Sequence, residues 1–289
     1  MSKNNALPRN ILSTIRSKNP RSSTTIKHIY NVRQRMIEAV LGERTEMQQI
    51  LKCLSDEKYT YSIRLFSDNQ TISDIFFAHL ESIKLFNLFP IVVVMDFTYK
   101  TNKYGLPLLE FVGTTCTGKT FSIAFAFMTA ENEDNFVWVL DRCRDLLKCP
   151  DHPQVVVTDR DAALMNVVDR GFLKSTALLC RCHVTVNVKT NMKGKYSVNG
   201  DKKEQGKTSK VYKDIMGAWE NIPDSETEES YADSVLMFRQ VCAVFPIFVE
   251  YVEGNILRPV KEKVVSAWTY RVMHLGNTTT NRIEPTQPG

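Results

Sequence analysis

The sequence predicts an α/β protein built on a mixed β-sheet that is covered by helices on both faces. Apolar runs rich in β-branched residues and stretches with period-two alternation indicate five strands, and stretches with a 3.6-residue period indicate helices between them. In chain order these are strands at 91–97, 106–116 and 120–128, a helix at 131–147, a strand at 154–158, a helix at 161–169 and a strand at 177–182. Three strands followed by alternating helices and strands are typical of a mixed sheet with helices on both faces.

Length and composition indicate a globular intracellular protein. The 289 residues are 43% hydrophobic and 24% charged, which is enough to bury one substantial core with a smaller helical part beside it. The apolar runs are too short to cross a bilayer, and the first residues lack the apolar stretch of a secretory signal. Seven cysteines at irregular spacings favour reduced thiols over a disulfide framework.

Four segments are expected along the chain. Residues 1–87 form a loosely ordered basic arm and a helical neck, which is interrupted at Gly42, with a short helix near 74–88 at its end. Residues 88–192 form the α/β core. Residues 193–269 comprise a basic loop and a helical insertion, with helical patterns at 211–220, 228–244 and 248–268. Residues 270–289 return to the core.

Positive charge is concentrated in two segments. The whole chain carries a formal charge of +5, whereas residues 1–52 alone carry +7 and residues 189–213 carry +6. Such segments attract a polyanion, and counterion release makes DNA the obvious partner. The candidate DNA contacts are Arg33, Arg35, Lys189, Lys193 and Lys195. The alternative, a solvated basic surface or a disordered arm, stays open.

Asp96 and Asp159 each stand just past a buried apolar strand, where a carboxylate is held rigidly and faces the crevice at the end of the sheet. Two such groups with a third acid would bind a pair of Mg²⁺ or Mn²⁺ ions through hard oxygen ligands. Ions about 3.5–4 Å apart activate the attacking oxygen and stabilise the leaving oxygen in phosphodiester chemistry. The alternative is that these aspartates cap helices or bind ribose. Composition does not choose the third acid among Glu220, Glu250, Glu253, Glu262 and Glu284.

Four ordered motifs resemble the catalytic domain of plant-type Mutator-like element (MULE) transposases. They lie at 95–109, 158–165, 180–183 and 274–284, and the resemblance extends over roughly residues 25–284. It implies a ribonuclease-H-like fold with a helical insertion before the last acidic residue, and an Asp-Asp-Glu site at Asp96, Asp159 and Glu284. It further implies an enzyme of the nucleus that cleaves and joins DNA at the terminal repeats of the element and at target sites. Such an enzyme can form a homo-oligomer.

The chain departs from that family at both ends. Pro285 and Pro288 follow Glu284 where family members continue into a long helix, and the zinc-coordinating DNA-binding domain of the family is missing. These departures predict a truncated product with impaired catalysis. The second hypothesis is therefore a domesticated or decayed relative that binds DNA or protein without catalysis.

The stretch Gly113–Thr120 matches the phosphate-binding loop pattern in its letters. A true phosphate loop passes from a strand into a helix, whereas the residues after Thr120 alternate like a strand. The sequence therefore predicts a hairpin at this position and no ATP binding.

Cys180 and His183 have the spacing of metal ligands, but one pair supplies half of a tetrahedral zinc site. A packed and hydrogen-bonded pair is favoured over structural zinc. Asp161 is expected to cap the following helix rather than to bind metal. Trp138, Trp219 and Trp268 are expected in the core, with base stacking by Trp219 or Trp268 as the alternative.

Overall fold

The computed structural model describes residues 6–98, 102, 104–194 and 210–279. It divides the chain into two compact units, residues 1–58 and 59–289. Among the described helices, none is both long and apolar enough to cross a membrane.

The first unit contains three helices, α1 (Pro8–Lys18), α2 (Ile26–Leu41) and α3 (Glu46–Asp56). The expectation of a loosely ordered arm is wrong over α1. Pro8 occupies the first turn of the helix, where a missing N–H costs nothing, so this proline starts the helix rather than breaking it. The predicted break between α2 and α3 is confirmed, since Gly42 ends α2 with a φ of 58°.

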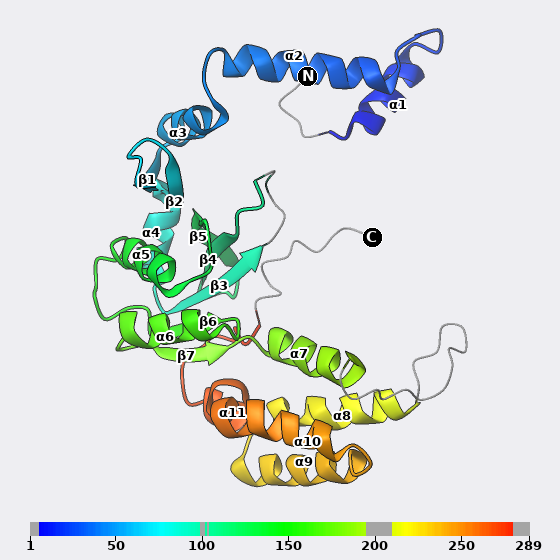
Figure 1. Ribbon diagram of the computed structural model, residues 1–289, viewed down its shortest axis with the longest axis vertical. Helices are drawn as coiled ribbons and strands as arrows, with labels where there is room; N and C mark the ends of the chain where they lie inside the picture. The colour runs from blue at the N-terminus through cyan, green and yellow to red at the C-terminus, as the bar shows by residue number, and fades with distance from the viewer. Residues whose placement is uncertain (1–5, 99–101, 103, 195–209, 280–289) are drawn as a thin grey trace. The chain divides into compact units, whose positions relative to one another are not determined.

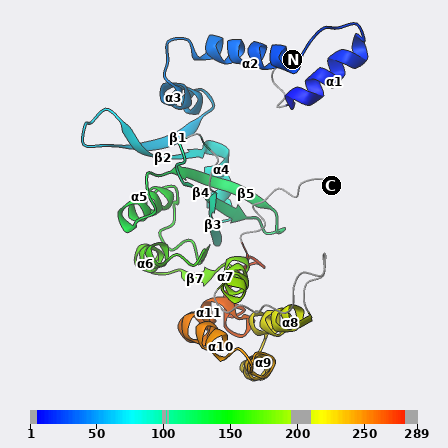
Figure 2. The ribbon, with the colours of Figure 1, turned by 45° about the vertical axis from the view of Figure 1, so that its right-hand side comes forward.

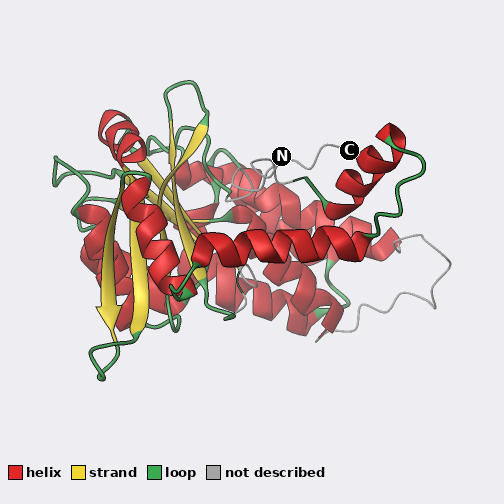
Figure 3. Cartoon of the chain, turned by 90° about the horizontal axis from the view of Figure 1, so that it is seen from above, coloured by secondary structure: helices red, strands yellow, loops and turns green. Residues whose placement is uncertain are grey.

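The second unit is built on a seven-stranded mixed sheet (Figures 1 and 3). Its strands are β1 (Tyr59–Leu65), β2 (Ile72–His79), β3 (Val92–Thr98), β4 (Leu108–Thr114), β5 (Thr120–Phe127), β6 (Val155–Thr158) and β7 (Thr176–Leu179). They lie in the order β1-β2-β5-β4-β3-β6-β7. β3, β6 and β7 run parallel, and the other neighbours are antiparallel. The predicted fold class, a ribonuclease-H-like mixed sheet flanked by helices, is confirmed.

One face of the sheet packs against α4 (Leu80–Leu88), α5 (Glu133–Arg144) and α6 (Ala162–Gly171). Phe86, Phe136 and Leu164 are the fully buried anchors that these helices contribute. The opposite face carries a smaller apolar cluster of strand residues, among them Val94, Val112 and Val157. Because side chains alternate along a strand, this second face is also the one that holds the functional groups described below.

A helical part follows β7 (Figure 1). It comprises α7 (Arg181–Gly194), α8 (Lys210–Asp224), α9 (Glu228–Val241), α10 (Pro246–Val252), the π-helical turn η1 (Glu253–Leu257), α11 (Arg258–Val264) and α12 (Ser266–Thr269). Its own core is centred on Trp219, Phe238 and Phe248, so the predicted helical insertion is confirmed.

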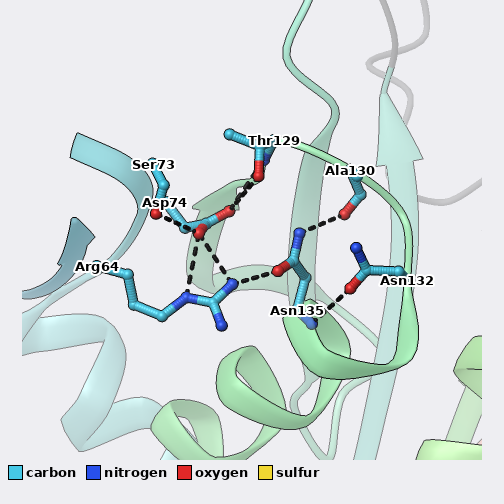
Figure 4. A network of polar contacts seen from close by, with 7 residues as sticks. All are labelled: Arg64, Ser73, Asp74, Thr129, Ala130, Asn132 and Asn135. Carbon is cyan, nitrogen blue, oxygen red and sulfur yellow. Dashed lines mark hydrogen bonds and ion pairs between the residues drawn. The ribbon is translucent and has the colours of Figure 1, made fainter. Parts of the chain in front are cut away.

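β1 and β2 lie inside the segment that the sequence assigned to the neck, and they extend the sheet at one edge (Figure 2). The expected short helix near 74–88 is wrong over residues 74–79, which belong to β2, and correct for α4. Asp74, near the start of β2, is a carboxylate that is only 2% exposed. It accepts hydrogen bonds from Arg64, Ser73 and Thr129, while Arg64 also donates to Asn135 at the start of α5 (Figure 4). Such pairing of remote segments is invisible to a local pattern.

Candidate metal centre at the carboxyl ends of the parallel strands

Asp96 lies near the end of β3, half-buried, on the same face of the sheet as Val92 and Val94. The β3–β4 register places Glu110 directly opposite it, so the two carboxylates share one face. Glu110 accepts a 2.6 Å hydrogen bond from Ser122 Oγ. Burial raises the pKa of Glu110, and the Ser122 hydrogen bond offsets this only in part. Glu110 was not among the predicted site residues, although an acid inside an otherwise apolar strand is a signal.

Asp159 follows β6 and continues the alternation of Val155 and Val157 on that same face. Val94 of β3 is paired with Val157 of β6 in parallel register, so Asp96 and Asp159 each stand two residues further along neighbouring parallel strands. The carboxyl ends of parallel strands meet at one edge of a sheet. The two aspartates are therefore brought to the same edge and the same face.

Cys180 and His183 join Asp159 at this edge. Cys180 follows β7, is fully buried, and is fixed by a 2.8 Å hydrogen bond from its backbone N–H to the carbonyl of Thr158. His183 lies in the first turn of α7, and its Nδ1 contacts Asp159 Oδ1. One possible ligand atom each from Asp159, Cys180 and His183 lies within 4.8 Å of the other two.

Hydrogen bonding to Asp159, and then to Cys180, raises the pKa of His183 to about 10, against the opposing effect of burial. Without a bound cation, the imidazole at neutral pH is therefore protonated and donates to the Asp159 carboxylate. The predicted Cys-x-x-His pair thus lies against an aspartate of the predicted acidic site, which the sequence analysis did not anticipate.

The remaining predicted site residues are dispersed. Glu284 and Lys195 lie outside the described residues, and Lys193 lies within α7. Lys189, also in α7, is 40% exposed, with its Nζ 3.9 Å from Glu220 Oε1. In the other unit, Arg33 and Arg35 are on α2, where Arg33 donates to the carbonyl of Ala6 and Arg35 is exposed.

A return segment, described over residues 270–279, leads back from the helical part to the sheet. Asn277 is 1% exposed, and its Oδ1 lies 3.1 Å from Thr114 Oγ1 at the end of β4. The carbonyl of Thr278 accepts a 2.9 Å hydrogen bond from the backbone N–H of Arg181, the residue after Cys180. The chain is thereby brought beside the candidate metal centre just before it leaves the described residues.

Three smaller predictions are also decided. Gly113–Thr120 spans the end of β4 and the first residue of β5, so the hairpin is confirmed and no helix follows the motif. Asp161 caps α6, accepting a 2.8 Å hydrogen bond from the N–H of Leu164, as expected. Trp219 is 1% exposed and donates to Thr185, so it is a core residue and is not available for base stacking.

The two other tryptophans pack against buried cores. The Trp138 ring lies 4.9 Å from the guanidinium carbon of Arg64. Trp268 packs edge-on against Tyr231, with Lys261 over its ring. The expected core placement of Trp138 and Trp268 is therefore supported. Each of the two rings also has a cationic side chain over it.

Comparison with known proteins shows which family part of this chain is similar to. Residues 92–187, which run from β3 into α7, match the family model of the MULE transposase domain. This segment is thus similar to the MULE transposase domain. It contains Asp96, Glu110, Asp159, Cys180 and His183, which are the described residues of the candidate metal centre.

Relatives of this chain include plant and fungal proteins. The chain is 29% identical over 160 residues to Protein FAR1-RELATED SEQUENCE 5 of Arabidopsis thaliana, a match that covers 54% of this chain and 20% of that protein. It is 28% identical over 144 residues to Putative protein FAR1-RELATED SEQUENCE 10 of the same plant, covering 50% and 19%. A PKS-NRPS hybrid synthetase of Chaetomium globosum is 30% identical over 184 residues, covering 61% of this chain and 4% of the synthetase.

The chain thus spans about a fifth of the length of these plant relatives and a far smaller share of the synthetase. The match to the MULE transposase domain and the FAR1-related relatives support a transposase-derived protein, in line with the four sequence motifs.

Proposed function

We propose that this chain carries the catalytic core of a DDE-type DNA transposase, which cleaves and joins DNA phosphodiesters with divalent metal ions. Asp96, Asp159 and Glu284 are the proposed acidic residues. The observation that carries the proposal is the meeting of Asp96 and Asp159 at the carboxyl ends of adjacent parallel strands, on one face of the sheet.

The residues at this edge fit Mg²⁺ or Mn²⁺. Asp96 and Asp159 supply carboxylate oxygens, the ligands that these hard cations prefer, and Glu110 adds a third carboxylate opposite Asp96. A bound metal pair supplies activation of the attacking oxygen and stabilisation of the leaving oxygen. The role of the protein is to hold the carboxylates on rigid strands, so that the DNA phosphate meets a preorganised site.

Glu284 is within chain reach of this edge. It follows Thr278 by six residues, and Thr278 is hydrogen-bonded to Arg181 beside Cys180. A six-residue stretch spans at most about 20 Å when fully extended. The anchored return segment therefore supports Glu284 as the third acid.

DNA is the proposed substrate, and the nucleus the proposed location. Lys189 on α7, with Lys193 further along the same helix and Lys195 after it, supports a phosphate-contacting surface in the same unit as the metal centre. Arg33 and Arg35 are proposed as further contacts from the other unit. Terminal repeats, target DNA and a second copy of the chain complete the proposed assembly.

The test is nicking of supercoiled plasmid DNA in Mg²⁺ or Mn²⁺ by the full chain and by Asp96→Asn and Asp159→Asn. Wild-type nicking that falls to background in both variants supports the proposal. Asp161→Asn is the matched control, because asparagine caps a helix as well as aspartate does and Asp161 lies only two residues from Asp159. Equal nicking by Asp96→Asn would overturn the assignment.

The second candidate is a transposase-derived protein that binds DNA or protein without catalysis. The contact between His183 and Asp159 favours it, because a protonated imidazole competes with a metal ion for that carboxylate. Wild-type chain that binds DNA but neither nicks it nor takes up Mn²⁺, as measured by calorimetry, would establish this candidate instead.

A further inference from the structure

Asp159, Cys180 and His183 bring a carboxylate, a thiol and an imidazole to one point of the molecule. We propose that these three residues form a binding site for a borderline-soft divalent cation of the Zn²⁺ class. Its ligand chemistry differs from that of the all-carboxylate centre, with which it shares Asp159. The inference goes beyond the proposed function, because it requires no DNA cleavage.

The backbone holds the three ligands in place independently of any ion. Asp159 and Cys180 continue the neighbouring parallel strands β6 and β7, which are paired up to Thr158 and Leu179. The N–H of Cys180 is bonded to the carbonyl of Thr158. His183 lies in the first turn of α7, three residues after Cys180, which directly precedes that helix.

The mutual distances suit a single ion. Zinc binds thiolate at about 2.3 Å and imidazole or carboxylate at about 2.0–2.2 Å, so ligand atoms around one ion stand roughly 3–4 Å apart. The three atoms already lie within 4.8 Å of one another. Side-chain adjustments of about 1 Å therefore suffice to surround an ion.

The ligand types decide the class of ion. Thiolate and imidazole favour zinc and its chemical neighbours, whereas Mg²⁺ takes oxygen ligands. Three protein ligands leave a fourth position for water or another group, as in zinc sites that remain open. Cys180 is fully buried, but the His183 side chain is 40% exposed and gives an ion access from solvent.

Sharing Asp159 links the two centres. A cation held by Cys180 and His183 would take the place of the direct contact between His183 and the Asp159 carboxylate. The Asp159 carboxylate would then be bound to a cation that is also held by Cys180 and His183. Occupancy by a thiophilic ion therefore changes how the carboxylate pair binds Mg²⁺ or Mn²⁺.

The test uses Co²⁺ as a spectroscopic substitute for Zn²⁺ in the chelator-treated full chain. Wild type is expected to show a thiolate-to-cobalt charge-transfer band that added Zn²⁺ removes. Cys180→Ser should lose the band. His183→Gln should weaken binding by more than the ~10–100-fold that loss of an outer-shell partner costs.

Cys182→Ser is the matched control, since Cys182 is a neighbouring half-buried cysteine outside the three-residue group, and it should keep the band. A Zn²⁺-induced rise in Tm should appear in wild type and Cys182→Ser and be absent from Cys180→Ser, which also shows that each variant folds. No charge-transfer band in wild type, or an undiminished band in Cys180→Ser, overturns the proposal.

Asp96→Asn separates this inference from the proposed function. Asp96 belongs to the carboxylate pair and not to the thiol–imidazole group. The variant should bind Co²⁺ with the wild-type spectrum while losing any Mn²⁺-dependent nicking. Failure of nicking in wild type with an intact cobalt spectrum would reject the transposase activity and retain the zinc-class site.

Discussion

His274 shows how a single side chain orders the return segment. The residue is 7% exposed, its Nδ1 accepts a 3.1 Å hydrogen bond from the N–H of Gly276, and its ring stacks on Tyr270. Burial, and secondarily the positive charge of Arg181, lowers the pKa of His274. At neutral pH the His274 ring of the folded chain is therefore neutral. Protonation at Nδ1 would remove the acceptor of the hydrogen bond from the N–H of Gly276.

The sign of the resulting pH dependence follows from linkage. The unfolded chain binds a proton at His274 near the ordinary pKa of 6.5, and the folded chain binds it only at lower pH. The contribution of His274 to stability is therefore full above pH 6.5 and is lost as pH falls towards the lowered pKa.

The unfolding free energy of wild type should fall between about pH 7.5 and pH 5. In His274→Gln we expect this fall to be smaller by about 1 kcal/mol, the order of one hydrogen bond. Urea denaturation at a series of pH values measures this difference. Parallel pH profiles for the variant and wild type would contradict the assignment.

The β4–β5 hairpin explains why Gly113–Thr120 matches the phosphate-loop pattern although it does not form a phosphate-binding loop. Gly118 has a φ of 74° in the turn, a conformation that glycine adopts without strain. Gly113 pairs with Phe121 across the hairpin, and a Cβ on Gly113 would lie 2.5 Å from the Phe121 ring. Both glycines therefore serve the backbone and packing of a hairpin.

Gly113→Ala should lower the unfolding free energy by about 1–3 kcal/mol through overpacking against Phe121. Combining it with Phe121→Leu should recover part of the loss, because the smaller side chain vacates the contested space. Gly171→Ala is the matched control: a Cβ there meets nothing within 4 Å, so little change or a slight gain is expected. A neutral Gly113→Ala would show that the ring moves aside freely.

For the second unit as a whole, Arg181 connects the sheet side with the helical part. Its side chain, 14% exposed, donates to the carbonyl of Val264 at 2.8 Å, to Asp224 at 3.0 Å and to Ser266 at 2.8 Å. Its backbone N–H holds Thr278 of the return segment. One residue next to Cys180 thus connects three remote parts of the chain.

Arg181→Lys should cost about 1–3 kcal/mol of unfolding free energy, since an ammonium group cannot reproduce the fork of guanidinium donors and leaves buried acceptors unpaired. Arg271→Lys is the matched control, because Arg271 is 61% exposed and forms a surface ion pair with Glu228, for which less than about 1 kcal/mol is expected. Equal effects in chemical denaturation would mean that Arg181 is no more than a surface cation.

The order of strands and helices from β3 to α7 could be predicted from the sequence, because hydrophobic periodicity is a local property of each segment. The sequence also located Asp96 and Asp159 at strand ends and Cys180 and His183 at ligand spacing, and its motifs indicated the family. The predictions of a loosely ordered arm over α1 and of a helix over part of β2 were wrong. In α1 a proline starts the helix, and in β2 a buried aspartate interrupts the apolar pattern.

The groups that meet at the site could not be predicted from local patterns, because they come together through the packing of distant segments. The tertiary structure placed Glu110 opposite Asp96, His183 against Asp159, and Thr278 beside Arg181. Each of these contacts depends on the register between segments distant in the chain, where a shift of one residue would turn every side chain to the other face. Burial of the whole sheet selects that register, and no single stretch of sequence carries it.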